Sequence, residues 1–200
     1  KALVGRLNAG ALPVPIKLIV QQAVGASLGE ESLARSLHAG LVGFLAVAAF
    51  MIMWYRLPGI LAVVALLVYT ALVLALFKLI PVTLTLAGIA GFILSVGMAV
   101  DANILIFARM REEFRSGKSF ESAIKEGAAR AWPSIRDSNM TTLLTCLVLY
   151  VFTTSTVKGF ALTLALGVLV SMFTAIYVSR LLLRLFVGTR IERLGWAWYK

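Results

Sequence analysis

Five long apolar runs constrain this chain more than any other feature of its sequence. Each run is close to the ~20 residues that an α-helix needs to cross the hydrocarbon core of a bilayer. A segment inside lipid must satisfy its own backbone hydrogen bonds, which a helix does and a lone strand does not. Hydrophobic residues make up 60% of the chain and charged residues only 14%, a balance foreign to soluble domains. We therefore predict an all-α membrane protein, a bundle of five transmembrane helices with spans at about 38–55, 58–77, 84–107, 140–156 and 160–187.

Three segments lie outside these spans. Residues 1–37 contain one β-branched stretch, 16–24, which predicts a single strand and hence the remnant of an extracytoplasmic domain. The link before the fourth span has apolar residues at helical spacing between Gly117 and Pro133, which predicts a cytoplasmic amphipathic helix. That helix could lie on the membrane surface, dock onto the bundle or receive a partner. Residues 188–200 are expected to form a cytoplasmic tail. Since the chain begins with Lys1 rather than Met, we expect a piece of a longer protein.

Basic residues predict the orientation of the bundle. Thirteen Lys and Arg lie in the link after the first span, the long link and the tail, whereas only Lys78 and Lys158 lie in the other links. Basic loops stay in the cytoplasm and attract anionic lipid. The net charge of +10 is thereby explained, and no phosphate-binding loop or basic aromatic tract points to nucleic acid. A single cysteine, Cys146, and a single histidine, His38, indicate no metal site or cofactor, and no hydrolytic constellation suggests an enzyme.

Asp101 is the residue most suggestive of function. It lies inside the third span, where a carboxylate costs about 3 kcal/mol on insertion scales and usually marks a proton or ion pathway. An apolar environment favours the neutral acid, whereas water or a nearby cation favours the charged form. A conformational change that alternates these environments would load and release a proton. The structural alternative is a permanently protonated carboxyl that is hydrogen-bonded to Asn103 or to a backbone carbonyl.

Further polar residues accompany Asp101. Gly97, one turn earlier, leaves space for a water or a neighbouring side chain. The fourth span opens with a polar run that we interpret as a hydrated path from the cytoplasm. As the structural alternative, Asp137 or Ser138 would cap the N-terminus of the fourth helix. The polar run consists of Asp137, Ser138, Asn139, Thr141, Thr142 and Thr145.

Small residues recur at every fourth position in the third and fifth spans. Helices in lipid associate through such residues, because they let two backbones approach closely. We predict that these two helices cross closely, with each other or with a partner chain, and ordinary bundle packing is the alternative. The two rows are Ala87, Gly91, Ser95, Ala99 and Asn103, and Thr163, Gly167, Ser171, Ala175 and Ser179.

The sequence resembles the SecD branch of the SecD/SecF family of protein-export membrane proteins, within the resistance-nodulation-division superfamily. The resemblance runs from about residue 7 to residue 187. Its most specific elements are GMAVDAN at 97–103 and DSNMTT at 137–142. Against the family pattern, the first span and most of the extracytoplasmic domain are absent.

The resemblance implies a function. Family members assist the SecYEG channel and the SecA motor, and they use the proton motive force to draw the translocating polypeptide across the bacterial cytoplasmic membrane. It implies a proton path through Asp101, faced by Asp137, Asn139, Thr141 and Thr142. The remaining charged groups would come from SecF, as a separate subunit or a fused half.

Two other functions stay open. The chain could be half of a proton-driven exporter of small molecules or lipids from the same superfamily, or a passive scaffold for a membrane partner. The extracytoplasmic domain would distinguish an exporter half from a SecD-type subunit. Exchange of Asp101 for Asn would distinguish a passive scaffold from both of these proton-driven functions.

Overall fold

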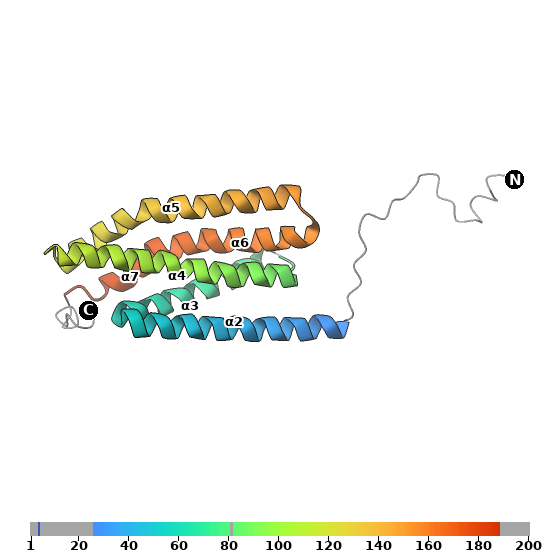
Figure 1. Cartoon of the computed structure of the whole chain (residues 1–200), viewed down its shortest axis with the longest axis horizontal. Helices are drawn as coiled ribbons and strands as arrows, with labels where there is room; N and C mark the ends of the chain where they lie inside the picture. The colour runs from blue at the N-terminus through green and yellow to red at the C-terminus, as the bar shows by residue number, and fades with distance from the viewer. Residues whose placement is uncertain (1–3, 5–25, 81, 189–200) are drawn as a thin grey trace. The chain divides into compact units, whose positions relative to one another are not determined.

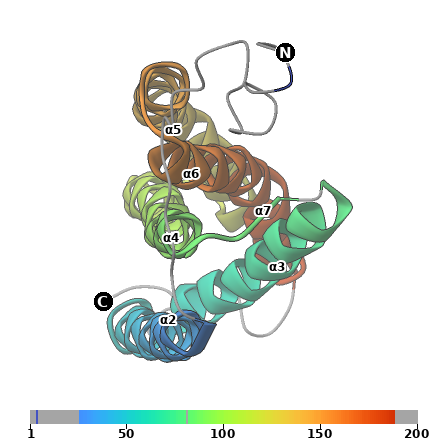
Figure 2. The ribbon, with the colours of Figure 1, turned by 90° about the vertical axis from the view of Figure 1, so that its right-hand side faces the viewer.

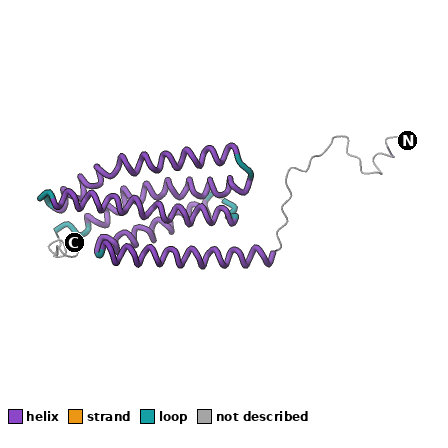
Figure 3. Tube along the Cα trace, viewed as in Figure 1, coloured by secondary structure: helices purple, strands orange, loops and turns teal. Residues whose placement is uncertain are grey.

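The computed structural model describes residues 4, 26–80 and 82–188 of the chain. Every regular element in this described part is a helix, as Figure 3 shows. The predicted all-α membrane bundle is therefore confirmed. The predicted strand at 16–24 and the tail beyond residue 188 lie outside the described residues.

The chain divides into two units, Lys1–Ser32 and Leu33–Lys200, and the bundle belongs to the second. Successive helices are joined by short connections. Arg56 alone separates the first two, and its φ of 54° makes the sharp reversal that this single-residue link requires. The helices are α2 (Ala26–Tyr55), α3 (Leu57–Leu79), α4 (Leu86–Arg115), α5 (Phe120–Phe152), α6 (Ser155–Phe173), the π-helix η1 (Thr174–Val178) and α7 (Ser179–Arg184).

Four segments in the described part are long and apolar enough to cross a membrane: Gly29–Tyr55, Leu57–Leu79, Leu86–Arg115 and Ser155–Arg184. Helix α5 is not among them, because its apolar stretch begins only after the polar run at 137–142. The helix bounds also differ from the expected spans, since Ser155 and Thr156 open α6 rather than end α5. The division of the chain into extracytoplasmic, membrane and cytoplasmic parts stays a prediction.

Helix α4 forms the centre of the bundle. It packs against α5 and α6 along much of its length, and α3 packs against α4, α6 and α7 (Figure 2). The turns between α2 and α3 and between α4 and α5 lie at the same end as α7, whereas the α3–α4 and α5–α6 connections lie at the other end (Figure 1). The basic links thus gather at one end of the bundle.

Helices α4 and α6 approach each other at glycines. A Cβ added to Gly91 would lie 2.5 Å from Thr163 Oγ1, and one added to Gly167 would collide with Ser95 and lie 2.9 Å from the Tyr69 hydroxyl. Polar side chains lie in the same contact. Thr163 donates to the Gly88 carbonyl at 2.8 Å, and the Tyr69 and Ser95 hydroxyls are hydrogen-bonded at 2.6 Å. The small residues therefore bring α4 and α6 of this one chain together.

The expected break at Pro133 is wrong. Helix α5 continues through this proline and joins the amphipathic segment to the predicted fourth span. Asp137 and Ser138 therefore lie in the helix interior, and neither caps an N-terminus. The amphipathic segment docks onto α4, where a Cβ at Gly127 would lie 2.5 Å from the backbone of Met110. A buried face that extends past the proline, with Ala131 and Ile135 both in the core, explains why the helix does not stop there.

Candidate functional site: a carboxyl in the middle of helix α4

Asp101 lies near the middle of α4, fifteen residues after Leu86 and fourteen before Arg115. At 1.5 Å per residue, it is about 22 Å from either end of the helix. Its side chain is exposed in the described structure and makes no hydrogen bond or ion pair with any described residue. The structural alternative of a hydrogen bond to Asn103 therefore does not hold here.

A small hollow lies between α4 and α5 at Asp101. Its volume is about 100 Å³. From α4 it is lined by Asp101 with three apolar neighbours, and from α5 mainly by polar side chains. Asn139 is only 7% exposed, so its amide is directed into the bundle beside this hollow rather than outward. The lining residues are Met98, Asp101, Ala102, Leu105, Ser134, Ile135, Ser138 and Asn139.

Asn103 lies apart from this hollow. It is 3% exposed, and its Oδ1 accepts a hydrogen bond of 2.5 Å from Ser179 Oγ. Two residues along a helix are separated by about 200° of rotation, so Asp101 and Asn103 necessarily take nearly opposite faces of α4. In this structure Asn103 joins α4 to α7, and Asp101 faces the open side.

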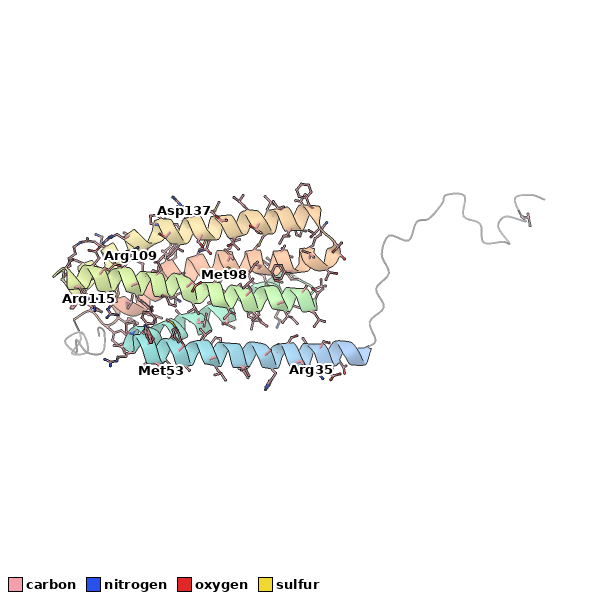
Figure 4. All side chains as sticks on the ribbon, in the orientation of Figure 1. Arg35, Met53, Met98, Arg109, Arg115 and Asp137 are labelled. Atoms are coloured by element: carbon pink, nitrogen blue, oxygen red, sulfur yellow. The ribbon has the colours of Figure 1, made fainter. Side chains whose placement is uncertain are left out.

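Asp137, Thr141 and Thr142 do not line the hollow either. Asp137 is on the outer face of α5 (Figure 4), and its Oδ1 accepts a hydrogen bond of 2.9 Å from Arg136 Nε. Thr141 donates to the Asp137 carbonyl at 2.9 Å and Thr142 to the Ser138 carbonyl at 3.2 Å. Both hydroxyls are thus satisfied by their own helix. They reach no polar partner on α4.

Gly97 opens space on a different face from the one expected. Among the described residues, no atom beyond the backbone of α4 itself lies within 4 Å of a Cβ placed on Gly97, but the space belongs to a groove between α2 and α4. In the rows of small residues, by contrast, Ser95, Ala99 and Ser171 are buried. The hollow at Asp101 is bounded instead by Met98 and Ala102.

Ser134 was missed as a lining residue, and Ser138 was expected only as part of the polar run that opens the fourth span. Both project from α5 into the hollow together with Asn139. The sequence held a signal for them, because residues 134 and 138 are one turn apart and fall on one face of a helix. The signal depended on a helix that continues past Pro133, which sequence reasoning did not expect.

A second group of charges lies at the end of α4. Glu113 is 3% exposed, and its carboxylate accepts hydrogen bonds from Lys118 Nζ at 2.5 Å and from the Arg130 guanidinium. Lys118 is also bonded to Glu126. The pKa of Lys118 is raised above its ordinary value, first by the hydrogen bond to Glu113 and then by the one to Glu126. These pairs tie the end of α4 to the beginning of α5.

The bundle and its unpaired carboxyl define a multi-pass helical membrane protein with a polar site inside an apolar helix. A family model described as "Protein export membrane protein SecD/SecF, C-terminal" matches residues 9–189. The chain therefore belongs to the SecD/SecF family of protein-export membrane proteins.

Curated relatives and solved structures agree with this assignment. The chain is 57% identical to the protein translocase subunit SecD of Thermobaculum terrenum, over 99% of this chain and 39% of that protein. It is 46% identical to the protein translocase subunit SecDF of Bacillus subtilis, over 98% of this chain and 27% of that protein. The crystal structure of a translocon-associated SecDF from Thermus matches with a TM-score of 0.85 and 39% identity, over 92% of this chain and 26% of that one. The chain thus spans less than half the length of each of these proteins.

Proposed function

We propose that the chain is the membrane part of a SecD-type subunit that couples proton flow to late steps of polypeptide translocation through SecYEG. The observation that carries this proposal is the position of Asp101. It is an unpaired carboxyl in the middle of an apolar helix, beside a hollow with the amide of Asn139 and two serine hydroxyls. Such a side chain is energetically costly to keep in lipid, so its presence indicates a proton or ion pathway. The hollow has polar side chains on its α5 wall, and its volume of about 100 Å³ is large enough to admit water beside the carboxyl.

The exposure of Asp101 supports a protein partner on this side of α4. A carboxyl at the middle of a membrane helix is not left against hydrocarbon. The described part of the chain provides no cation near it, so the group that balances its charge would come from SecF, either a separate subunit or a fused half. The long extracytoplasmic region of such a subunit would contact the translocating polypeptide, and the SecA motor would act earlier in the same cycle.

In this proposal the residues differ in their roles. Asp101 binds and releases the proton, and Asn139 with Ser134 and Ser138 holds water beside it. Asn103 positions α4 against α7 through Ser179. Asp137, Thr141 and Thr142 would enter the path only after a rearrangement of α5, because they face away from the hollow here. No covalent chemistry is assigned to this chain.

The basic end of the bundle supports an orientation. We place the α2–α3 turn, the α4–α5 link and the C-terminus on the cytoplasmic side of the bacterial inner membrane, because loops rich in Lys and Arg stay inside. The α3–α4 and α5–α6 connections then face outward, on the side of the extracytoplasmic domain.

The test is Asp101→Asn in the full-length complex. Asn preserves size and hydrogen bonding and cannot exchange a proton. We expect the proton-gradient-dependent part of translocation to be lost in inverted membrane vesicles, while the subunit still assembles. Glu112→Gln is the matched control, since Glu112 is an exposed carboxylate of the same helix that pairs with Arg109 and has no part in the proposed path. Unchanged gradient dependence in Asp101→Asn would refute the proposal, and an equal loss in both variants would show that this hollow is not the site.

One alternative remains for comparison: half of a proton-driven exporter of small molecules or lipids. It shares the proton site, so the Asp101 variant does not separate the two. An assay of secretory polypeptide translocation separates the two, because loss of an exporter half would not change translocation at any proton gradient.

A further inference from the structure

A second cavity lies at the basic end of the bundle, on another side from Asp101. Its volume is about 320 Å³. It opens between the first half of α5 and the segment formed by η1 and α7, with Ile106 of α4 among its lining residues. Three lining side chains matter for its chemistry: Trp132 on α5, Tyr177 on η1 and Arg180 on α7. Arg180 is the only charged residue among the described lining residues.

The guanidinium of Arg180 lacks a partner in the described structure. The side chain is half-buried, yet no hydrogen bond or ion pair joins it to any described residue. A cation that is partly removed from water without a partner is unfavourable, because its hydration is lost and not replaced. Arginine in such a position suits an anion with several oxygens, above all a phosphate group, which its planar fork can bind through two hydrogen bonds.

The π-helix directs Arg180 toward this cavity. The Ser179 amide donates to the Thr174 carbonyl five residues earlier, which adds one residue to the turn. Each added residue rotates the following helix by about 100°, and π-turns are often found at functional sites. Ser179 then faces Asn103 in the core, and Arg180 follows at the edge of the bundle.

The surface beside the cavity is apolar and continuous. Exposed apolar side chains recur every fourth residue along α6, η1 and α7, in a row that passes through Tyr177. Tyr177 itself is 63% exposed, and its ring lies 5.0 Å from that of Phe173. Trp and Tyr prefer the headgroup level of a bilayer, where one side of the ring is apolar and the other wet. The row consists of Leu169, Phe173, Tyr177, Leu181 and Leu185.

We propose that this cavity binds the phosphate headgroup of an anionic phospholipid, with Arg180 as the phosphate ligand. Trp132 and Tyr177 flank the glycerol region, and the acyl chains follow the exposed apolar row toward the membrane centre. Anionic lipid was expected only as a diffuse partner of the basic face; the structure assigns it a specific site. The cavity is comparable in size to small-ligand pockets, which suits a headgroup and not a whole lipid.

Fluorescence quenching of Trp132 tests this proposal. The full-length protein carries Trp132 as its only tryptophan, the others being replaced by Phe, and is reconstituted in phosphatidylcholine nanodiscs. A minor share of the lipid has brominated acyl chains and is either phosphatidylglycerol or phosphatidylcholine. We expect an apparent affinity about five-fold higher for brominated phosphatidylglycerol, as one basic residue near a membrane surface provides. Equal quenching by the two lipids, or none by either, would overturn the proposal.

Two variants and one competitor complete the design. Arg180→Gln should abolish the preference for phosphatidylglycerol, whereas Arg184→Gln should preserve it, because Arg184 is exposed and does not line the cavity. Equal losses in both would mean diffuse surface attraction and would contradict a site. Inorganic phosphate should not relieve the quenching; relief would assign the site to a soluble phosphate compound and overturn the lipid. Thermal unfolding of each variant verifies that it is folded.

Discussion

Two of the three carboxylates of helix α4, Glu113 and Asp101, are in opposite situations. Glu113 is 3% exposed and is bonded to Lys118 and Arg130 of the same chain. Asp101 is exposed and has no partner among the described residues, although it lies deeper in the apolar part of the helix. The carboxylate at the end of α4 thus has cations that offset its charge, whereas the carboxyl in the apolar middle of the helix has none.

The difference indicates two kinds of role. A buried carboxylate with two cations is satisfied within its own fold, and its removal leaves cations without a partner. A carboxyl in the apolar middle of α4 without a partner among the described residues has no ion pair that would stabilise this fold, and its presence requires another reason. Glu113 is therefore interpreted as a structural residue that joins α4 to α5, and Asp101 as a functional one.

The largest expected effect is that the two carboxylates affect different properties: Glu113 the stability of the protein, and Asp101 the gradient dependence of translocation. Glu113→Gln should lower the Tm of the detergent-solubilised protein by several degrees and preserve the gradient dependence of translocation, because Lys118 and Arg130 lose their shared partner. Asp101→Asn should leave Tm almost unchanged and abolish that dependence. Thermal unfolding and vesicle translocation of both variants measure this. If Asp101→Asn destabilised the protein as much as Glu113→Gln, the distinction would not hold.

The next effect concerns two glycines, one in the contact between α6 and α4 and one on an open face of α4. Gly167→Ala should destabilise the bundle by about 1–3 kcal/mol, because the added methyl collides with Ser95 on α4. Gly97→Ala should be neutral or stabilising by up to about 1 kcal/mol, because its Cβ meets open space and alanine favours the helix. Denaturant unfolding of the two variants provides the comparison. A similar change in free energy for both would count against the close approach of α4 and α6.

The membrane helices could be predicted because the composition alone excludes a soluble fold. In the third and fifth runs, small residues at every fourth position also indicated two helices that approach closely. The structure places Gly91 of the first against Thr163 of the second. What the sequence left open was whether the partner of each row was in this chain.

The candidate site was harder to predict, since it depends on helix faces. Asp101 and Asn103 were grouped by their distance along the chain, yet two residues are about 200° apart around a helix. The same rotation separates Asp137 from Asn139, and only Asn139 faces the hollow. The continuity of α5 could not be read from the sequence either. The helix survives Pro133 because Ala131 and Ile135 are buried against the rest of the bundle, a tertiary effect.

The smallest expected effect is a pH dependence at the Glu113 cluster. The pKa of Lys118 is raised in the fold by its bonds to Glu113 and Glu126. A raised pKa means that the contribution of Lys118 to stability is fully present below the ordinary lysine value of about 10.4. This contribution to stability is lost as the pH rises through the raised pKa.

The difference in Tm between the unmodified protein and Lys118→Met should therefore be constant at neutral pH and shrink above about pH 10.4. Lys125→Met, which removes an exposed lysine without a described ion pair, should show no such trend. A difference that shrinks equally for both variants would mean that general alkaline unfolding, and not the pair with Glu113, is responsible.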